Sequence, residues 1–448
     1  MRSSWSMKKV SNRYAQAIAL MLGAFGAVCS ADVASALEFN FGFSEDTPSD
    51  VISGFNQAGQ LWSSILKDDV DVNINVEFRD VNSPSLGFFQ PQRVSYDYSD
   101  IKSALFSDQT STDDAIAYNT LASNSDFGLL VDFDLLLNGT SNNPNGVGSL
   151  VPYVDDDGDC NNRSIRITTA NAKALGLSNS NAPLCGLASS NRTSSSPDGT
   201  IILNSNFSWD FDTSNGIDAQ SFDFIGVAAQ GIAVTLGFIS GVDVLDFNVP
   251  QTINGQNFYY DDGLFPFVST MDLFRYSQGS SELGVIDWTT GRPNSQGQEV
   301  DKYFSIDGGV TKIASFSTGL RNGDGFRASS WKPDELGGIS LGIMESTPAA
   351  GQILQFSDND RRLFDVIGWN LEDESAEPPV RGVKQDPPDD PNNPDDNPPT
   401  TGGTDPPNTG GENPDDPSDP VKVPEPSAAI SLLLLVGLTL KLWKKTTC

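Results

Sequence analysis

One stretch of this chain, residues 221–247 (SFDFIGVAAQGIAVTLGFISGVDVLDF), constrains the possible folds more than any other. Between Phe224 and Phe238 almost every residue is apolar, so a helix formed here has no polar face. A helix that is apolar all round lies inside a domain. Gly237 is expected to end the helix, because glycine readily adopts the backbone conformation of a helix C-terminus. The residues after it, up to Phe247, read as a strand.

This helix has the setting of an active-site helix without the chemistry. Zinc proteases place His-Glu-x-x-His on such a helix, because positions i and i+4 share a face and the glutamate activates the metal-bound water. In the frame VAA-QGIAV-TLGF, these positions are Gln230, Gly231 and Val234. An amide is a poor zinc ligand, and neither glycine nor valine offers a donor. The whole chain contains no histidine.

With these residues in place, VAAxxIxxxLGFISGVDVLDF resembles the metalloproteases of the metzincin class, in particular leishmanolysin-like enzymes and their secreted bacterial relatives. The resemblance covers residues 37–371 and includes RASSWKPDELGGISLGIMESTP. It implies a third metal ligand just before a tryptophan, where this chain has Ser330, and a methionine turn beneath the metal, where it has Met344. The implied fold is α+β: a two-lobed zincin-like or metzincin-like domain with a central buried helix.

Two functions are compatible with this pattern. The favoured hypothesis is a catalytically inactive, metalloprotease-like protein without zinc, which binds a peptide, a matrix protein or a polysaccharide in the former cleft. The alternative is an active zinc-dependent metallopeptidase with unusual ligands such as Asp243, Asp246 or Glu345. A catalytic metal needs several converging donors and a base, so the first hypothesis is preferred. The stretch GTIILNSNFSWDF, residues 199–211, is expected to supply a short apolar strand before the buried helix. The resemblance implies an edge strand at this place, which can hold a peptide by strand addition.

The remaining pattern is that of an α+β domain. A strand, an amphipathic helix, an alternating strand and two more helices are expected at residues 37–43, 50–66, 70–78, 100–105 and 112–121. After the buried helix, residues 250–326 are rich in Gly, Ser and Asp and are expected to form a lower subdomain. A helix capped by Ser357 is expected to close the domain.

The segment VPYVDDDGDCNNRS places Asp155, Asp157 and Asp159 beside a glycine. Clustered carboxylates are typical calcium ligands, so one interpretation is a calcium loop. The other is a solvated acidic turn, because Cys160 stands where the EF-hand pattern needs glycine. Of the four cysteines, Cys160 and Cys185 are the two that lie outside the terminal segments 1–36 and 423–448. We expect them to form a disulfide, which suits an exported compartment.

Both ends of the chain carry transport signals. Residues 1–36 combine basic residues, an apolar run and Ala34-Ser35-Ala36, which is typical of a secretory signal peptide. Residues 372–422 are rich in Pro, Asp, Asn and Gly, and we expect a disordered linker. Residues 423–448 join a short apolar run with lysines to a five-residue motif made of Val423, Pro424, Glu425, Pro426 and Ser427.

This C-terminal segment resembles the PEP-CTERM sorting signal of exopolysaccharide-associated bacterial proteins. The resemblance implies a sorting protease of the exosortase type that cuts a transmembrane segment. The protein is therefore expected to be exported, transiently membrane-anchored, and then part of the cell surface or extracellular matrix. The net charge of −32 argues against a nucleic-acid partner. Paired carboxylates can hydrolyse glycosides, but no particular pair stands out.

Overall fold

The computed structural model shows a mixed α+β protein, as the sequence predicts. It describes residues 37–122, 124–126, 130–177, 196–253, 255–291, 300–333, 340–373 and 375–382. The predicted signal peptide, Cys185, most of the predicted linker and the whole sorting segment lie outside these ranges and stay predictions. Within the described ranges, no helix has both the length and the apolar character needed to cross a membrane.

The largest sheet has four strands, in the spatial order β1 (Glu38–Phe43), β2 (Asp71–Arg79), β10 (Gly199–Asn204) and β3 (Gly87–Pro91). The first three run parallel, and β3 runs antiparallel to β10. The prediction that residues 199–204 form an edge strand is wrong, because β10 pairs on both sides and β3 takes the edge. Strand β10 is buried on both faces except at Thr200, which suits an interior strand.

Strand β2 confirms the predicted alternation. Val72, Ile74 and Val76 are buried, while Asp71, Asn75 and Glu77 are exposed. Side chains of successive strand residues point to opposite faces of a sheet. One face of β2 therefore lies on the core and the other meets solvent.

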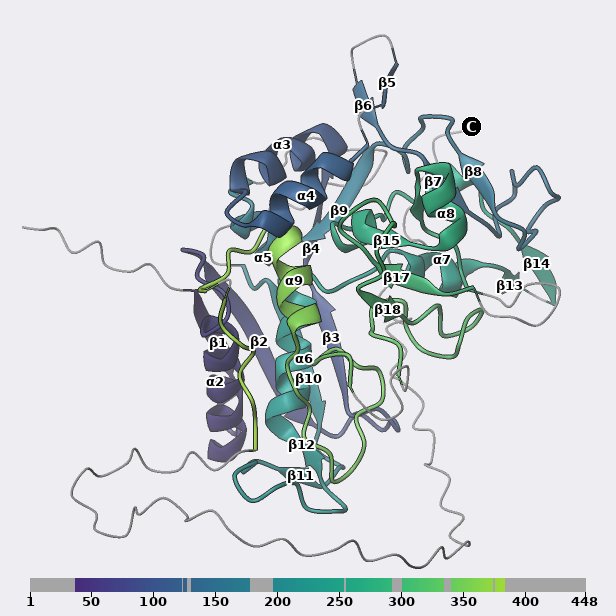
Figure 1. Cartoon of the computed structure of the whole chain (residues 1–448). Coiled ribbons are helices and arrows are strands. Elements are labelled where there is room, and N and C mark those ends of the chain that lie inside the picture. The colour runs from purple at the N-terminus through teal and green to yellow at the C-terminus, as the bar shows by residue number, and fades with distance from the viewer. Residues whose placement is uncertain are drawn as a thin grey trace, which may run out of the picture.

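Two helices pack against the core of this sheet (Figure 1). Helix α2 (Ser49–Ser63) connects the parallel strands β1 and β2, and it lies beside α6 (Phe224–Leu236), the predicted buried helix. Trp62 Nε1 donates to the carbonyl oxygen of Ala229 at 3.0 Å. The rings of Phe55 and Phe224 meet edge to face with centroids 5.7 Å apart. Both predicted helices are confirmed.

The next part of the chain forms a helical layer at one end of the sheet (Figure 1). The two predicted helices there are confirmed as α3 (Tyr98–Asp108) and α4 (Thr112–Thr120). Ser111 starts α4 with a capping box, because its hydroxyl accepts from the Asp114 amide while that carboxylate accepts from the Ser111 amide. A two-stranded ladder then leads into a short helix; these elements are β4 (Arg93–Asp97), β9 (Ser164–Thr168) and α5 (Thr169–Ala174).

Small sheets and short helices make up the other side of the molecule (Figure 1). Two three-stranded sheets have the orders β16-β7-β8 and β15-β17-β18. Their strands are β7 (Leu135–Leu137), β8 (Tyr153–Asp155), β15 (Arg275–Tyr276), β16 (Ile286–Asp287), β17 (Lys302–Phe304) and β18 (Ala314–Phe316). Two two-stranded ladders are β5 (Asn124–Asp126) with β6 (Leu130–Asp132) and β13 (Gln251–Ile253) with β14 (Gln256–Phe258). The remaining helices here are η1 (Asp262–Leu264), η2 (Met271–Phe274) and α8 (Gln278–Leu283). A further ladder, β11 (Trp209–Asp210) with β12 (Phe222–Asp223), lies instead at the start of α6 (Figure 1).

The strand predicted after Gly237 is not a strand. Residues 242–248 form helix α7 (Val242–Asn248). A short apolar run does not distinguish a strand from a buried helix by its pattern alone. Here the helical spacing places Asp243 and Asp246 one turn apart, and both carboxylates bind backbone amides of the segment 321–328. These contacts favour the helix.

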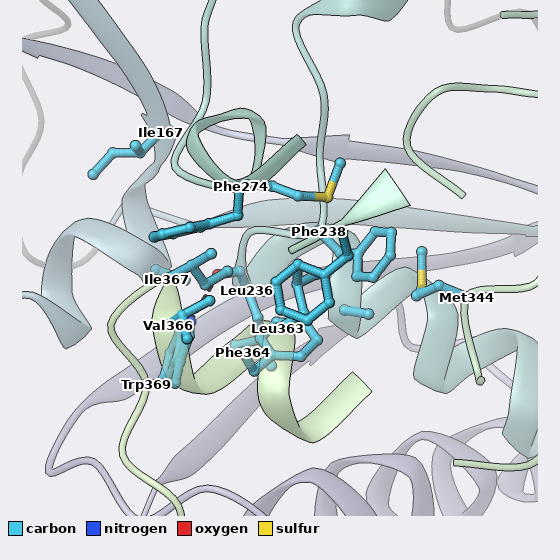
Figure 2. Packing of buried hydrophobic residues seen from close by; sticks show 14 of the residues in the cluster. Ile167, Leu236, Phe238, Phe274, Met344, Leu363, Phe364, Val366, Ile367 and Trp369 are labelled. Carbon is cyan, nitrogen blue, oxygen red and sulfur yellow. Dashed lines mark hydrogen bonds between the residues drawn. The ribbon is translucent and has the colours of Figure 1, made fainter. Parts of the chain in front are cut away.

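Helix α9 (Asp358–Val366) closes the domain, as predicted, with Ser357 as its N-cap. The Ser357 hydroxyl accepts from the amides of Asn359 and Asp360. Figure 2 shows Leu363 and Phe364 of this helix packed in one buried cluster with Leu236, the last residue of the central helix, and Phe238, just after it. The core thus joins the main sheet's helices to the last helix of the domain.

The folded body extends past the predicted boundary at residue 371. Arg381 is buried and forms a two-point ion pair with Asp223, the N-cap of α6. Its Nη1 also donates to the carbonyl oxygen of Leu354 at 2.7 Å. Bidentate guanidinium–carboxylate pairs are geometrically specific. Arg381, ten residues into the predicted linker, is therefore held against the start of the central helix.

Candidate functional site

The central helix α6 carries Gln230, Gly231 and Val234, the three positions that the sequence resemblance maps to a zinc motif. Asp223 caps the helix by accepting from the Gly226 amide at 2.9 Å. Gly237 ends it with a φ of 134°, a conformation that favours glycine. Every residue of the helix is buried except Val234, which is half-buried and packs against the core.

Gln230 ties the helix to the methionine turn. Its side-chain nitrogen Nε2 donates to the carbonyl oxygen of Ile343 at 2.8 Å and to that of Glu345 at 3.0 Å. These two residues flank Met344, which is itself buried. An amide has two N–H donors, and both are used here. The structure therefore brings together the two predicted positions, Gln230 and Met344, but through a structural bond between helix and turn.

Gly231, at the position that the resemblance maps to the catalytic base, leaves little space for a side chain. A Cβ atom built there would lie 3.0 Å from Ile201 Cδ1 and 3.1 Å from Phe89 Cδ1. Ile201 belongs to β10 and Phe89 to the edge strand β3. Helix α6 thus lies directly against the edge of the sheet at the point where a catalytic glutamate would be needed.

Ser330 lies in the same neighbourhood as the methionine turn. The amide of the next residue, Trp331, donates to the carbonyl oxygen of Met344 at 3.0 Å. Ser330 is buried, and its own carbonyl oxygen accepts from the Ser317 amide. The rings of Trp331 and Phe238 meet edge to face with centroids 5.1 Å apart. The segment that resembles the third-ligand region therefore packs beside the end of α6.

Asp360 is a residue of this region that the sequence does not single out. It is fully buried at the start of α9, and it accepts from Trp331 Nε1 and from the Ile343 amide, each at 2.8 Å. Its carboxylate occupies the place where a Cβ of Gly342 would lie. Burial raises the pKa of Asp360 to about 6, although its hydrogen bonds oppose the shift. Asp360 thus fixes the tryptophan and the methionine turn to one helix.

The alternative metal ligands do not converge. Asp243 Oδ1 accepts from the Ala328 amide, and Asp246 accepts from the amides of Arg321 and Asn322, all at 2.8 Å. These two carboxylates therefore hold a loop. In the described part of the chain, two groups of three acidic residues have ligand atoms within 4.8 Å of one another, and neither contains Asp243, Asp246 or Glu345.

Both of those groups lie elsewhere, between an acidic loop (residues 155–161) and an acidic turn (residues 261–263). One group is Asp155, Asp157 and Asp262, and the other is Asp159, Asp261 and Asp262. The sequence predicts the three loop residues but not the two from the turn, which lie about a hundred positions further along the chain. The adjacent pair Asp261-Asp262 before a glycine is the only sequence signal for them.

Burial and like charges dominate the electrostatics of this acidic region. Asp155 is 3% exposed, and burial, followed by the carboxylate of Asp262, raises its pKa to about 7. Burial also raises the pKa of Asp159. Tyr153 and Asn142 donate to Oδ2 of Asp262, the tyrosine at 2.6 Å. The Asp159 carboxylate fills the place where a Cβ of Gly263 would lie.

Comparisons of the chain with protein-family models, with curated proteins and with solved structures found no match. The function of the chain is therefore inferred from its own residues and their geometry.

Proposed function

We propose that this chain is an exported surface protein that binds an extended peptide or matrix-protein segment on a two-lobed, metzincin-like scaffold without catalysing its cleavage. The observation that carries the proposal is the position of the edge strand β3 against the degenerate helix. Phe89 of β3 contacts α6 at Gly231. Strand edges bind extended peptides through backbone hydrogen bonds. A peptide added to β3 would run along the helix that lacks its metal ligands.

The hydrogen-bond pattern of β3 defines the groups offered to a peptide. The Asn204 amide donates to the Leu86 carbonyl, and the Gln92 amide donates to the Asp198 carbonyl. The backbone N–H and C=O groups of the even-numbered residues of β3 therefore point toward β10. In an antiparallel ladder the alternate residues point their backbone groups the other way. Gly87 and Phe89 therefore direct N–H and C=O groups outward. Pro91, the next outward position, has no N–H, which suits a sheet edge.

The contacts that the motif residues make support a protein without catalytic activity. Gln230 has both donors on backbone carbonyls, and Gly231 is packed against Ile201 and Phe89. Catalytic zinc sites use imidazole, thiolate or carboxylate ligands together with a base. The described residues around α6 supply other groups at these positions. We therefore assign no zinc and no other cofactor to this region.

Export and sorting complete the proposed function. The signal peptide, the five-residue motif at 423–427 and the lysines after the apolar run support passage across a membrane and cleavage by an exosortase-type protease. The acidic composition suits a polysaccharide-rich or crowded surface and disfavours nucleic acid. An active metallopeptidase with unusual ligands remains the second candidate, favoured only by the abundance of carboxylates.

The proposal is tested with an array of mixed-sequence dodecapeptides and a purified sample of the protein. We expect binding without cleavage, and for a selected peptide we expect N-methylation of alternate residues to abolish binding. N-methylation of the intervening residues should leave it unchanged, because only every second amide faces β3. In the protein, Phe89→Pro removes an outward N–H and should weaken binding, while Gln90→Ala serves as the control.

Metal content and peptidase activity decide between the two candidates. We expect less than stoichiometric zinc and no peptide cleavage. Stoichiometric zinc, together with cleavage that a chelator abolishes, would overturn the inactive assignment. Binding that is insensitive to N-methylation at every position would overturn strand addition, and would point to recognition through side chains or a polysaccharide instead.

A further inference from the structure

Five carboxylates meet between the acidic loop and the acidic turn. They form two groups of three that share Asp262, and the ligand atoms of each group lie within 4.8 Å of one another. Two ligands of one calcium ion, each about 2.4 Å from it, are at most ~4.8 Å apart. The spacing of each group is thus that of oxygens around a calcium ion.

A buried amide oxygen in the loop is a second indication of a bound calcium ion. Asn161 is 0% exposed; its Nδ2 donates to Asp155 Oδ2 at 2.7 Å, and its backbone amide donates to Asp159 Oδ1 at 3.1 Å. Its side-chain oxygen Oδ1 has no hydrogen-bond partner among the described residues. The head of this side chain therefore lies among the carboxylates with its acceptor unused. A cation satisfies such an oxygen, and side-chain amide oxygens are ordinary calcium ligands.

Among the described residues, the five carboxylates also have no salt bridge to a lysine or arginine. The guanidinium closest in sequence is that of Arg163. It lies beside Gly158, and its Nη2 is 4.0 Å from Asp132 Oδ2. Asp155 and Asp262 are 3% and 1% exposed. Buried carboxylates are normally paired or bound to a metal.

We propose that the acidic loop and the acidic turn together bind calcium, with Asp262 as the shared ligand and the side-chain oxygen of Asn161 as an uncharged one. The donors are all oxygens, which calcium prefers and which suit zinc poorly. Asp157 and Asp261 are exposed, so the ion has a path from solvent. A bound ion links β8 and its loop to the turn at η1, two segments about a hundred residues apart in the chain. Calcium binding at this site is independent of peptide binding at β3.

Binding is measured by calorimetric titration of the chelator-treated, full-length protein with calcium chloride at constant ionic strength, with magnesium chloride in parallel. We expect saturable calcium binding, weaker magnesium binding, and a melting temperature about 5 °C or more higher when calcium is a hundredfold above its Kd. No saturable calcium binding, or equal affinity for both ions, would overturn the assignment.

Two substitutions of equal charge separate a site from general electrostatics. Asp157→Asn removes an exposed ligand and should weaken calcium binding at least tenfold, since even the loss of a partner of a metal ligand costs about 10- to 100-fold in affinity. Asp156→Asn removes the same charge from the exposed neighbour, which belongs to neither group, and should change affinity less than about twofold. Equal effects of the two variants would show that calcium responds only to the general surface charge, and would overturn the proposed site.

Terbium luminescence provides a local readout that does not depend on stability. The Tyr153 hydroxyl lies 2.6 Å from Asp262 Oδ2. A terbium ion bound at the calcium position should therefore emit on excitation of tyrosine, and calcium should displace it. Tyr153→Phe should reduce this emission while calcium still binds. Undiminished emission in Tyr153→Phe and in Asp157→Asn would place the ion elsewhere and contradict the proposal.

Discussion

At the scale of single residues, the positions that the sequence resemblance maps to a zinc motif make structural contacts. Gln230 donates to the carbonyls on both sides of Met344, and Asp360 accepts from Trp331 Nε1 and the Ile343 amide. A histidine at position 230 does not reproduce the two parallel donors of an amide. Replacing motif residues by metal ligands therefore has to overcome the contacts that now stabilise this region.

Substitution of Gln230 tests this structural role. Gln230→Ala leaves two buried carbonyl oxygens without their donor and should lower the free energy of unfolding by about 2–3 kcal/mol. Urea denaturation measures the change. Gln57→Ala, on the exposed face of α2, removes only a surface contact with Ser53 and should change stability by less than about 0.5 kcal/mol. Similar changes in the free energy of unfolding for the two variants would contradict the structural role proposed for Gln230.

At the scale of elements, the close approach of α2 and α6 positions the central helix. Trp62 reaches across to the backbone of α6, and Gly54 lets the two helices come together over Phe224. The aromatic residues Phe55, Phe211 and Trp209 surround the same ring. The interface is therefore specified by one small residue and several rings, and it determines where the motif positions lie.

A methyl group at this interface should be costly. In Gly54→Ala the added Cβ would lie 2.5 Å from Phe224 Cδ1 and 2.6 Å from Cε1. We expect a net loss of about 1–3 kcal/mol from overpacking, even though alanine favours a helix by ~1 kcal/mol. Gly279→Ala, on the exposed side of α8 with only Ser277 Oγ at 4.0 Å, should be neutral or stabilising. Thermal unfolding distinguishes the two, and a stable Gly54→Ala would show that the helices can separate.

At the scale of the whole molecule, distant segments meet through carboxylates. Asp68 follows α2, Asp108 ends α3 and Asp114 lies in α4, and Asn370 near the end of the domain donates to the first two of them. Burial, and then the carboxylates of Asp68 and Asp114, raise the pKa of Asp108 to about 7. The stability of the contacts between the last segment and the rest of the domain therefore depends on pH.

The sign of that dependence is testable. Because the folded state binds the Asp108 proton more tightly, this group adds stability below its ordinary pKa of 3.8, and the contribution is lost as pH rises toward 7. Asp108→Asn should be more stable than the parent at pH 8 by about 1 kcal/mol, a value reduced from the full shift because the carboxyl is partly exposed. The two should be similar at pH 4.

Urea unfolding at several pH values gives the comparison, with the exposed Asp46→Asn as the control. The control should follow the parent at every pH. A parent stability that rises between pH 4 and 7 relative to Asp108→Asn would contradict the assigned direction.

The sequence by itself determined the elements whose pattern is local. The apolar helix 224–236, the alternating strand β2, and the cap at Ser357 follow from periodicity and side-chain chemistry, and the lack of any histidine ligand follows from residue identity alone. Only the tertiary structure decided which strand forms the sheet edge, that α7 is a helix, that Arg381 returns to Asp223, and that Asp261 and Asp262 join the acidic loop. These features depend on contacts between residues far apart in the chain, and periodicity within a window carries no information about such contacts.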